Sequence, residues 1–215
     1  MRTKARISTR YRVGTPWLFA IGAAAIAVPT DPAAHGQARA FVEGGAGFSA
    51  PIGNLAQRQE FGTTVGLNIG FRISDGWVVK ANTEVEMLEG TFVSFAERSA
   101  PLTLIHVGIG AERRVIRSGN RDWELLGEFG AGRTTMRTVG LGGAKVVDRP
   151  FGHSCNSSYG GLTALTHPTR RATVVLRGRI RWMMMDRNQT EGLAGSSPFS
   201  SAYTMPITVG LVLSL

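Results

Sequence analysis

The sequence predicts an all-β protein: an eight-stranded antiparallel up-and-down transmembrane β-barrel that follows an N-terminal signal peptide. Three observations predict this fold. Apolar and polar side chains alternate in eight stretches of the chain, which places the apolar side chains of each strand on one face. The connections between these stretches are alternately long and short. No apolar run reaches the length of about 18 residues that a membrane-spanning helix needs.

The composition fits such a barrel and excludes other classes. The chain has 215 residues, of which 43% are hydrophobic, and a membrane strand needs an apolar residue only at every second position. The net charge of +9 is spread without a dense run of Lys or Arg, so we expect no nucleic-acid partner. The single cysteine, Cys155, excludes an internal disulfide. No phosphate loop, dinucleotide fingerprint or metal-ligand spacing is present, so we expect no cofactor and no metal.

The first 38 residues have the organisation of an export signal. Basic residues are scattered through positions 2–12, an apolar core follows at 17–28, and small residues surround Ala38. We predict a signal peptide over residues 1–38, cleaved after Ala38 or alternatively after Ala40, and a barrel over residues 39–215. The other interpretation is an uncleaved N-terminal anchor, for which the apolar core is short.

The first four strands are predicted at residues 40–48, 61–72, 77–87 and 102–115. The alternation is cleanest in 61–72, where Phe, Val, Leu and Ile occupy odd positions and Gly, Asn and Arg occupy even ones. Residues 77–87 place Trp, Val and Ala on one face and Lys and Glu on the other. In 102–115, Ile and Val alternate with His, Gly and Glu. Each pattern has the period of two that a half-apolar strand requires.

The last four strands are predicted at residues 122–133, 158–166, 172–185 and 203–215. Residues 122–133 place Trp, Leu and Phe opposite Glu and Gly, and residues 172–185 place Val, Leu, Ile and Trp opposite three arginines. Residues 158–166 are bounded by a Gly-rich segment and a His-Pro-Thr turn. Residues 203–215 combine a wholly apolar face with a face of small, mostly polar residues.

Short and long connections alternate between these strands. The short turns are predicted at 74–76, 118–120 and 167–169, and the long loops at 49–60, 88–101, 135–157 and 186–201. Both ends of the strand series then lie on the short-turn side. An even number of strands with this asymmetry is typical of barrels that span a membrane.

The two faces of the strands carry different side chains. Aromatic residues gather on the apolar face near both ends, which predicts two membrane girdles: Phe71, Trp77 and Trp123 near the short turns, and Phe48, Phe61, Trp182 and Tyr203 near the long loops. The polar face carries both signs of charge, which predicts a structural charge network in a narrow lumen: Arg72, Lys80, Glu84, Glu86, Glu112, Arg114, Glu124, Glu128, Arg177, Arg179 and Arg181. We expect Arg114 to lie nearly opposite Glu124 across a hairpin.

Alternation alone leaves a second arrangement open. A soluble barrel of the lipocalin kind would turn the apolar face inward, around a small ligand. The segregated aromatic residues, the mixed charges and the many glycines of the polar face favour the membrane arrangement.

The export signal, the eight amphipathic strands, the unequal connections and the final stretch from Tyr203 to Leu215 resemble the small bacterial outer-membrane β-barrel proteins, of the OmpA-type transmembrane domain and OmpX-type group. Two residues depart from that pattern: Leu215 replaces the usual terminal aromatic residue, and Pro206 removes a hydrogen-bond donor from its strand. The resemblance implies a monomer in the outer membrane, in contact with its lipid. It also implies that residues 203–215 are recognised by the barrel-insertion machinery.

The resemblance implies a non-enzymatic protein with a structural or surface-interaction role through its long loops. One alternative is a narrow channel or transporter for small or apolar molecules. Another is a lipid-modifying enzyme similar to the outer-membrane lipid A deacylases, which would use His153 and Ser154. These two are adjacent, so they would point to opposite faces of a strand, and no acid is placed beside them. We expect His106 to be a hydrogen-bonded structural residue in the lumen and Cys155 to be a surface thiol.

Overall fold

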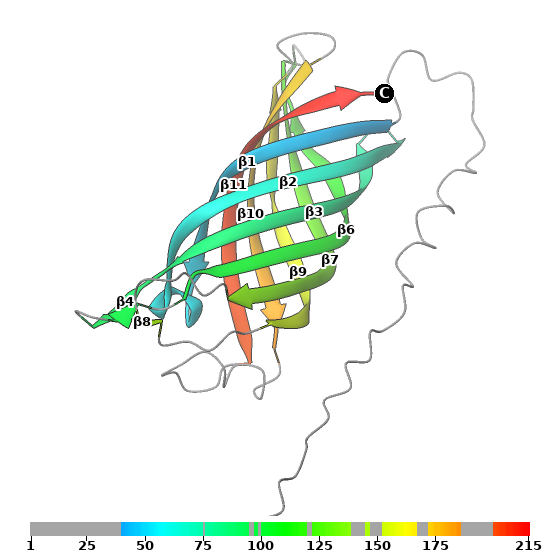
Figure 1. The fold of residues 1–215 in the computed structure, drawn as a ribbon. Coiled ribbons are helices and arrows are strands. Elements are labelled where there is room, and N and C mark those ends of the chain that lie inside the picture. Colours follow the sequence, from blue (N-terminus) through cyan, green and yellow to red (C-terminus); the bar gives the residue numbers. More distant parts are fainter. Residues whose placement is uncertain are drawn as a thin grey trace, which may run out of the picture. The chain divides into compact units, whose positions relative to one another are not determined.

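Eight long strands close into an antiparallel barrel (Figure 1). The computed structural model describes residues 40–74, 76–94, 97–98, 100–119, 122–138, 145–146, 152–166, 172–185 and 200–215. The predicted signal peptide, the turn at 167–169 and nearly all of the loop at 186–201 lie outside these residues.

The barrel strands follow one another in sequence order around the barrel, and the last pairs with the first. They are β1 (Ala40–Ile52), β2 (Gln59–Ser74), β3 (Trp77–Gly90), β6 (Leu102–Arg117), β7 (Trp123–Thr138), β9 (Gly152–Thr166), β10 (Ala172–Met184) and β11 (Ser201–Ser214). This is the predicted eight-stranded up-and-down topology, and the prediction is confirmed. The closing pair continues past the strands, since the backbone N–H of Leu215 donates to the carbonyl of Ala40 at 3.0 Å.

Six of the eight barrel strands, all except β6 and β10, are longer on the loop side than the sequence predicts. The loop predicted at 135–157 is wrong at both ends, because β7 continues to Thr138 and β9 begins at Gly152. The reason is that outward side chains become polar here, as at Thr135 and Ser154, so the hydrophobic alternation disappears although the backbone ladder continues. The sequence pattern reports the apolar surface rather than the hydrogen bonds.

The predicted long loops contain further structure. Strands β4 (Phe92–Ser94), β5 (Glu97–Arg98) and β8 (Lys145–Val146) form a small separate sheet, in which β5 and β8 are parallel. Figure 1 places this sheet at the end of the barrel opposite the C-terminus. Between β1 and β2, Gly53 has a φ of 65°, and the chain then forms one 3-10 turn, η3 (Leu55–Gln57).

The outside of the barrel is apolar and its inside is polar. Large apolar side chains on alternate strand positions are exposed, including Ile69, Phe129 and Leu211, each more than half exposed. The buried side chains include most of the charged residues of the strands. The lipocalin-like alternative is therefore wrong, because it would require an apolar interior. Among the described residues, no helix is long and apolar enough to cross a membrane.

Pro206 has a local effect on the ladder. Strand β11 pairs continuously with β1, where Pro206 lies opposite Ser49. On its other side, the pairing with β10 stops at Ile207 and resumes at Thr204. A proline cannot donate a backbone hydrogen bond, so one side of the strand loses part of its ladder while the barrel stays closed.

Candidate functional site: the barrel lumen

Charged side chains from five strands meet in the middle of the lumen. We call this set the central network: Glu43 of β1, Lys80, Glu84 and Glu86 of β3, Glu112 of β6, Glu128 of β7, and Arg177, Arg179 and Arg181 of β10. All nine are buried, at most 4% exposed. The strands point them inward because each occupies the inward parity of its strand.

Arg177 connects three carboxylates. Its guanidinium donates two bonds to Glu43, one of them at 2.8 Å, and contacts Glu112 at 3.1 Å and Glu128 at 2.9 Å. Thr163 donates from β9 to the same two carboxylates, Glu112 at 3.2 Å and Glu128 at 3.1 Å. A planar guanidinium with five donors suits such a shared site better than a single ammonium.

Arg179 and Arg181 continue the network toward the loops. Arg179 contacts Glu84 at 2.9 Å and Glu128 at 2.5 Å. Arg181 contacts Glu84 at 2.6 Å and also pairs with Glu86. The three arginines are spaced two residues apart on β10, so all point inward, and the glutamates of β3 face them across the lumen.

Lys80 completes the network and brings its charges close to balance. Its ammonium lies 2.5 Å from Glu112 and 2.8 Å from Glu128. Hydroxyl groups contribute further donors, with Thr64 donating to Glu84 at 3.0 Å and Ser49 donating to Glu86. Buried charges are tolerated when they are paired and hydrogen-bonded, which is the condition met here by four cations and five carboxylates.

The remaining predicted lumen charges lie at the turn end. Glu124 contacts Arg114 at 3.1 Å and Arg117 at 3.0 Å. Arg114 therefore lies across the hairpin from Glu124, while Arg117 was not among the predicted lumen residues. Arg72 is half-buried at the end of β2, where the pairing with β3 shifts register. None of these three arginines belongs to the central network.

Glycines of β6 and β7 make room for two rings. A Cβ at Gly110 would lie 2.2 Å from the Tyr159 hydroxyl oxygen, and one at Gly130 would lie 2.3 Å from the Tyr159 Cζ. Tyr159 also stacks edge-on against His106, with ring centroids 5.7 Å apart, and lies beneath the guanidinium of Arg179 at 4.9 Å. The glycines are thus required for the close approach of the ring to the barrel wall.

His106 is hydrogen-bonded within the lumen. Its Nδ1 lies 3.1 Å from both the Thr134 and Ser157 hydroxyl oxygens, and its side chain is fully buried. On the neighbouring strand β3, Glu84 is paired with His106 in the register.

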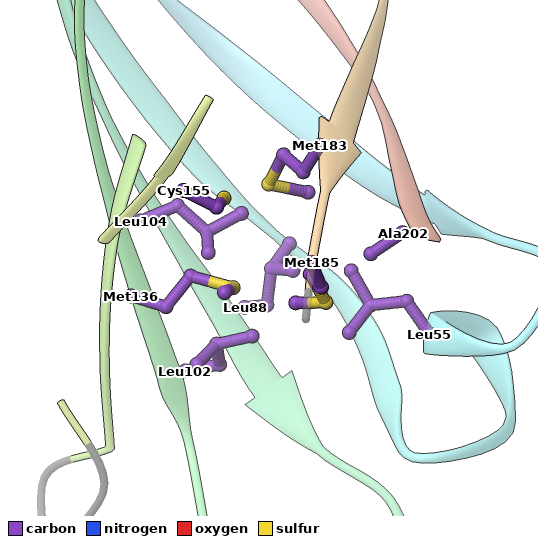
Figure 2. Close-up of a cluster of buried hydrophobic side chains, with 9 residues drawn as sticks. All are labelled: Leu55, Leu88, Leu102, Leu104, Met136, Cys155, Met183, Met185 and Ala202. Carbon is purple, nitrogen blue, oxygen red and sulfur yellow. The ribbon is translucent and has the colours of Figure 1, made fainter. Parts of the chain in front are cut away.

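The loop-side mouth of the lumen is filled by apolar side chains. We call this set the mouth plug: Leu55, Leu88, Leu102, Leu104, Met136, Cys155, Met183, Met185 and Ala202. Figure 2 shows side chains from opposite walls of the barrel converging here, with Leu55 entering from the turn that follows β1. The prediction of a surface thiol is wrong, since Cys155 is only 6% exposed. Cys155 is buried because it lies on β9 with inward parity. The sequence analysis placed it in a loop because it predicted that this strand begins only after residue 157.

A polar pocket lies beside the central network. The residues that line it include the small residues Gly45, Gly66 and Thr208 of β1, β2 and β11, together with Glu84 and Arg179. Glu43 and Arg177 of the central network also line this pocket, so the network borders a small space that the glycines of β1 and β2 leave open.

The candidate deacylase residues have opposite parity on β9. His153 lies opposite buried Met136 in the register, on the inward parity of β9. Ser154 has the outward parity, and its Oγ lies 2.9 Å from the Thr135 Oγ1 on β7. Among the described residues, no group of three His, Cys, Asp or Glu side chains could hold a metal ion.

The residues predicted to form the girdles lie near the ends of their strands. Phe48, Phe61, Trp77, Trp123 and Trp182 are exposed, whereas Phe71 and Tyr203 are half-buried. Two of the rings pack together near the loops, since Trp182 and Tyr203 stack with centroids 6.4 Å apart. Near the turns, Trp77 packs edge-on against Phe129 at 6.5 Å.

Glu43 and Tyr159 are two of the lumen residues that the sequence analysis missed. Glu43 shares the parity of Gly45 and Gly47, so a strict application of the inward pattern to residues 40–48 would have included it. Tyr159 has no such signal, because an aromatic residue on the inner face breaks the polar pattern that defines that face.

No protein-family model matches the sequence, and no curated protein matches it. Among solved structures, the chain is similar to the Neisserial surface protein A (NspA), with a TM-score of 0.56, 10% identity, and coverage of 82% of this chain and 97% of that chain. It is also matched by Ail, the attachment invasion locus protein of Yersinia pestis, with a TM-score of 0.47, 12% identity, and coverage of 82% and 99%. The likeness to NspA confirms, at the level of the fold alone, the predicted resemblance to small outer-membrane barrels.

Proposed function

We propose that this chain is an exported, non-enzymatic β-barrel protein of the bacterial outer membrane, with a structural or surface-interaction role through its long loops. The observation that carries the proposal is that apolar side chains lie on the outside of the barrel and charged side chains lie inside, the reverse of a water-soluble protein. An exposed apolar belt surrounds a lumen whose nine central charges are paired and buried. In water this arrangement would expose a large apolar area, whereas in a bilayer the belt faces lipid and the closed ladder satisfies the backbone.

The lumen supports a structural role over that of a channel. The mouth plug fills the loop side with side chains that are at most 7% exposed. Below it, Arg177, Arg179 and Arg181 cross the interior to carboxylates on other strands. An eight-stranded barrel has an interior just wide enough for side chains to fill, and these fill most of it.

The loops and β11 are the parts that would meet partners. The described part of the loops already contains ordered elements, the β4–β5–β8 sheet and η3, which could present a defined surface to a partner outside the cell. The outward face of β11, from Tyr203 to Leu215, supplies the amphipathic signal through which the insertion machinery would recognise the chain.

The first experiment fractionates cells that express the full chain and examines outer-membrane samples by gel electrophoresis with and without boiling. We expect the protein in the outer-membrane fraction, with a band that shifts on boiling because the closed barrel unfolds. A soluble periplasmic protein without such a shift would overturn the proposal. Conductance of the purified protein in planar bilayers then separates the two lumen hypotheses: we expect no discrete channels, and steady openings would make it a channel.

A further inference from the structure

Two exposed arginines point outward from the loop-side half of β7. Arg133 and Arg137 flank Thr135 on the outward parity, and the register places Asn156 and Ser154 of β9 beside them. We call these five residues the β7–β9 polar patch. The hydroxyls of Thr135 and Ser154 lie 2.9 Å apart, so the two strands present one continuous polar surface.

The depth of this patch follows from the strand geometry. Arg133 lies ten residues beyond Trp123, the aromatic residue at the turn end of β7. At roughly 3.3 Å per residue and a tilt of about 40°, ten residues rise about 25 Å, the height of the apolar band of a membrane barrel. Arg133 therefore lies where the apolar band ends, and Arg137 lies about 10 Å farther, at the depth of lipid headgroups.

The strands on either side of the patch present apolar side chains to the outside. On one side, β6 presents Val107 and Ile109 to the outside, and on the other, β10 presents Trp182 and Met184. In the loop-side halves of β6, β7, β9 and β10, no described outward residue is an Asp or Glu. Neither arginine forms an ion pair with another residue of the described part of the chain. Within the described part of the chain, the patch is thus a pair of cations without a paired carboxylate, bordered by the apolar side chains of β6 and β10.

We propose that the β7–β9 polar patch binds a phosphate-bearing glycolipid of the outer leaflet, with Arg133 and Arg137 contacting phosphate and with Thr135, Ser154 and Asn156 contacting the sugar. This rests on the proposed function, because it requires that the long loops face outward across the outer membrane. Guanidinium groups form charge-assisted hydrogen bonds to phosphate, and hydroxyl and amide groups suit sugar hydroxyls. The acyl chains would pack against the adjacent belt of β6 and β10.

The test uses the full-length protein purified from membranes in neutral detergent. Binding of purified bisphosphorylated lipid A is measured by native mass spectrometry, in parallel with enzymatically dephosphorylated lipid A and with phosphatidylglycerol. We expect lipid A to bind to the R133Q/R137Q variant at least about tenfold more weakly than to the unchanged protein. Its dephosphorylated form and phosphatidylglycerol should bind both proteins weakly.

The matched control is R113Q, which removes an outward arginine at the turn end, where Arg113 lies over Trp77 at 5.4 Å. It should bind lipid A as the unchanged protein does. Equal binding to R133Q/R137Q, an equal loss in R113Q, or equally tight binding of phosphatidylglycerol would each overturn the glycolipid site. All variants should keep the heat-shifted band. Loss of that band in the unchanged protein would instead refute the membrane barrel, so the two proposals fail in different ways.

Discussion

The middle of the lumen and its loop-side mouth are closed by opposite chemistries. The central network fills its section with charges whose partners lie on other strands, whereas the mouth plug fills the next section with Leu, Met, Cys and Ala. In the central network, the stability contributed by each side chain depends on hydrogen bonds and ion pairs with specific atoms of its neighbours. In the mouth plug, the stability contributed by each side chain depends mainly on the volume that it fills. The two regions should therefore respond differently to substitution.

The largest effect is expected for Arg177→Met in the central network. The change leaves Glu43, Glu112 and Glu128 buried without the cation that connects them. Losing one partner of a buried ion pair costs about 3–5 kcal/mol, so the free energy of unfolding in phospholipid vesicles should fall by that amount. Urea titration followed by tryptophan fluorescence measures it. Arg113→Met, outside the barrel, is the control, and a loss below about 1 kcal/mol for Arg177→Met would contradict the network.

In the mouth plug, the expected effect depends on size rather than on chemistry. Leu104 is fully buried, so Leu104→Ala should lower the free energy of unfolding by about 2–4 kcal/mol through the cavity it leaves. The matched change Leu104→Met keeps the volume and should cost less than about 1.5 kcal/mol. Equal losses for the two variants would show that the plug is as specific as the network.

Between the two regions, the ring of Tyr159 tests how tightly the wall is packed. A Cβ at Gly130 would lie 2.3 Å from the Tyr159 Cζ and 2.6 Å from the carbonyl oxygen of Ile109. Gly130→Ala should therefore cost about 1–3 kcal/mol by overpacking. Gly160→Ala is the control, because its nearest atom would be 3.7 Å away. A Gly130→Ala protein as stable as this control would show that both the Tyr159 ring and the neighbouring backbone of Ile109 can shift.

The smallest effect is expected at the turn end, where ion pairs reach water. The side chains of Arg114 and Arg117 are 14% and 24% exposed around Glu124. Glu124→Gln should cost about 1 kcal/mol or less, and the difference from the unchanged protein should shrink at about 1 M salt. A salt-independent loss would place this cluster with the central network instead.

The sequence predicts the barrel and most of its inward charges because the period of two survives wherever the outer face of a strand is apolar. Lys80, Glu84 and Arg179 were identified from that pattern alone. Glu43 was missed because its stretch is rich in glycine and shows little contrast between its faces. Cys155 was misplaced because β9 begins earlier than its apolar residues indicate.

The contacts across the lumen could not be predicted. Alternation places a side chain inside or outside, but it does not say which strands face each other across the interior. The contact between Arg179 and Glu84 joins β10 and β3, which are not neighbours in the barrel. Such a contact depends on the tilt and stagger of the closed sheet, which no local pattern contains. The plug needs the same information, and it also needs the turn that brings Leu55 back over the mouth.

The seam between β1 and β11 has a consequence for how the protein is made. Phe41 pairs with Ser214 and Ile52 pairs with Tyr203, so one edge of the first barrel strand has no partner until the last strand is made. Until β11 has emerged from the ribosome, both edges of the sheet are open, and open edges invite association with other chains. The ladder between the first and last strands can therefore form only after synthesis of β11, so the barrel closes after translation of its strands is complete.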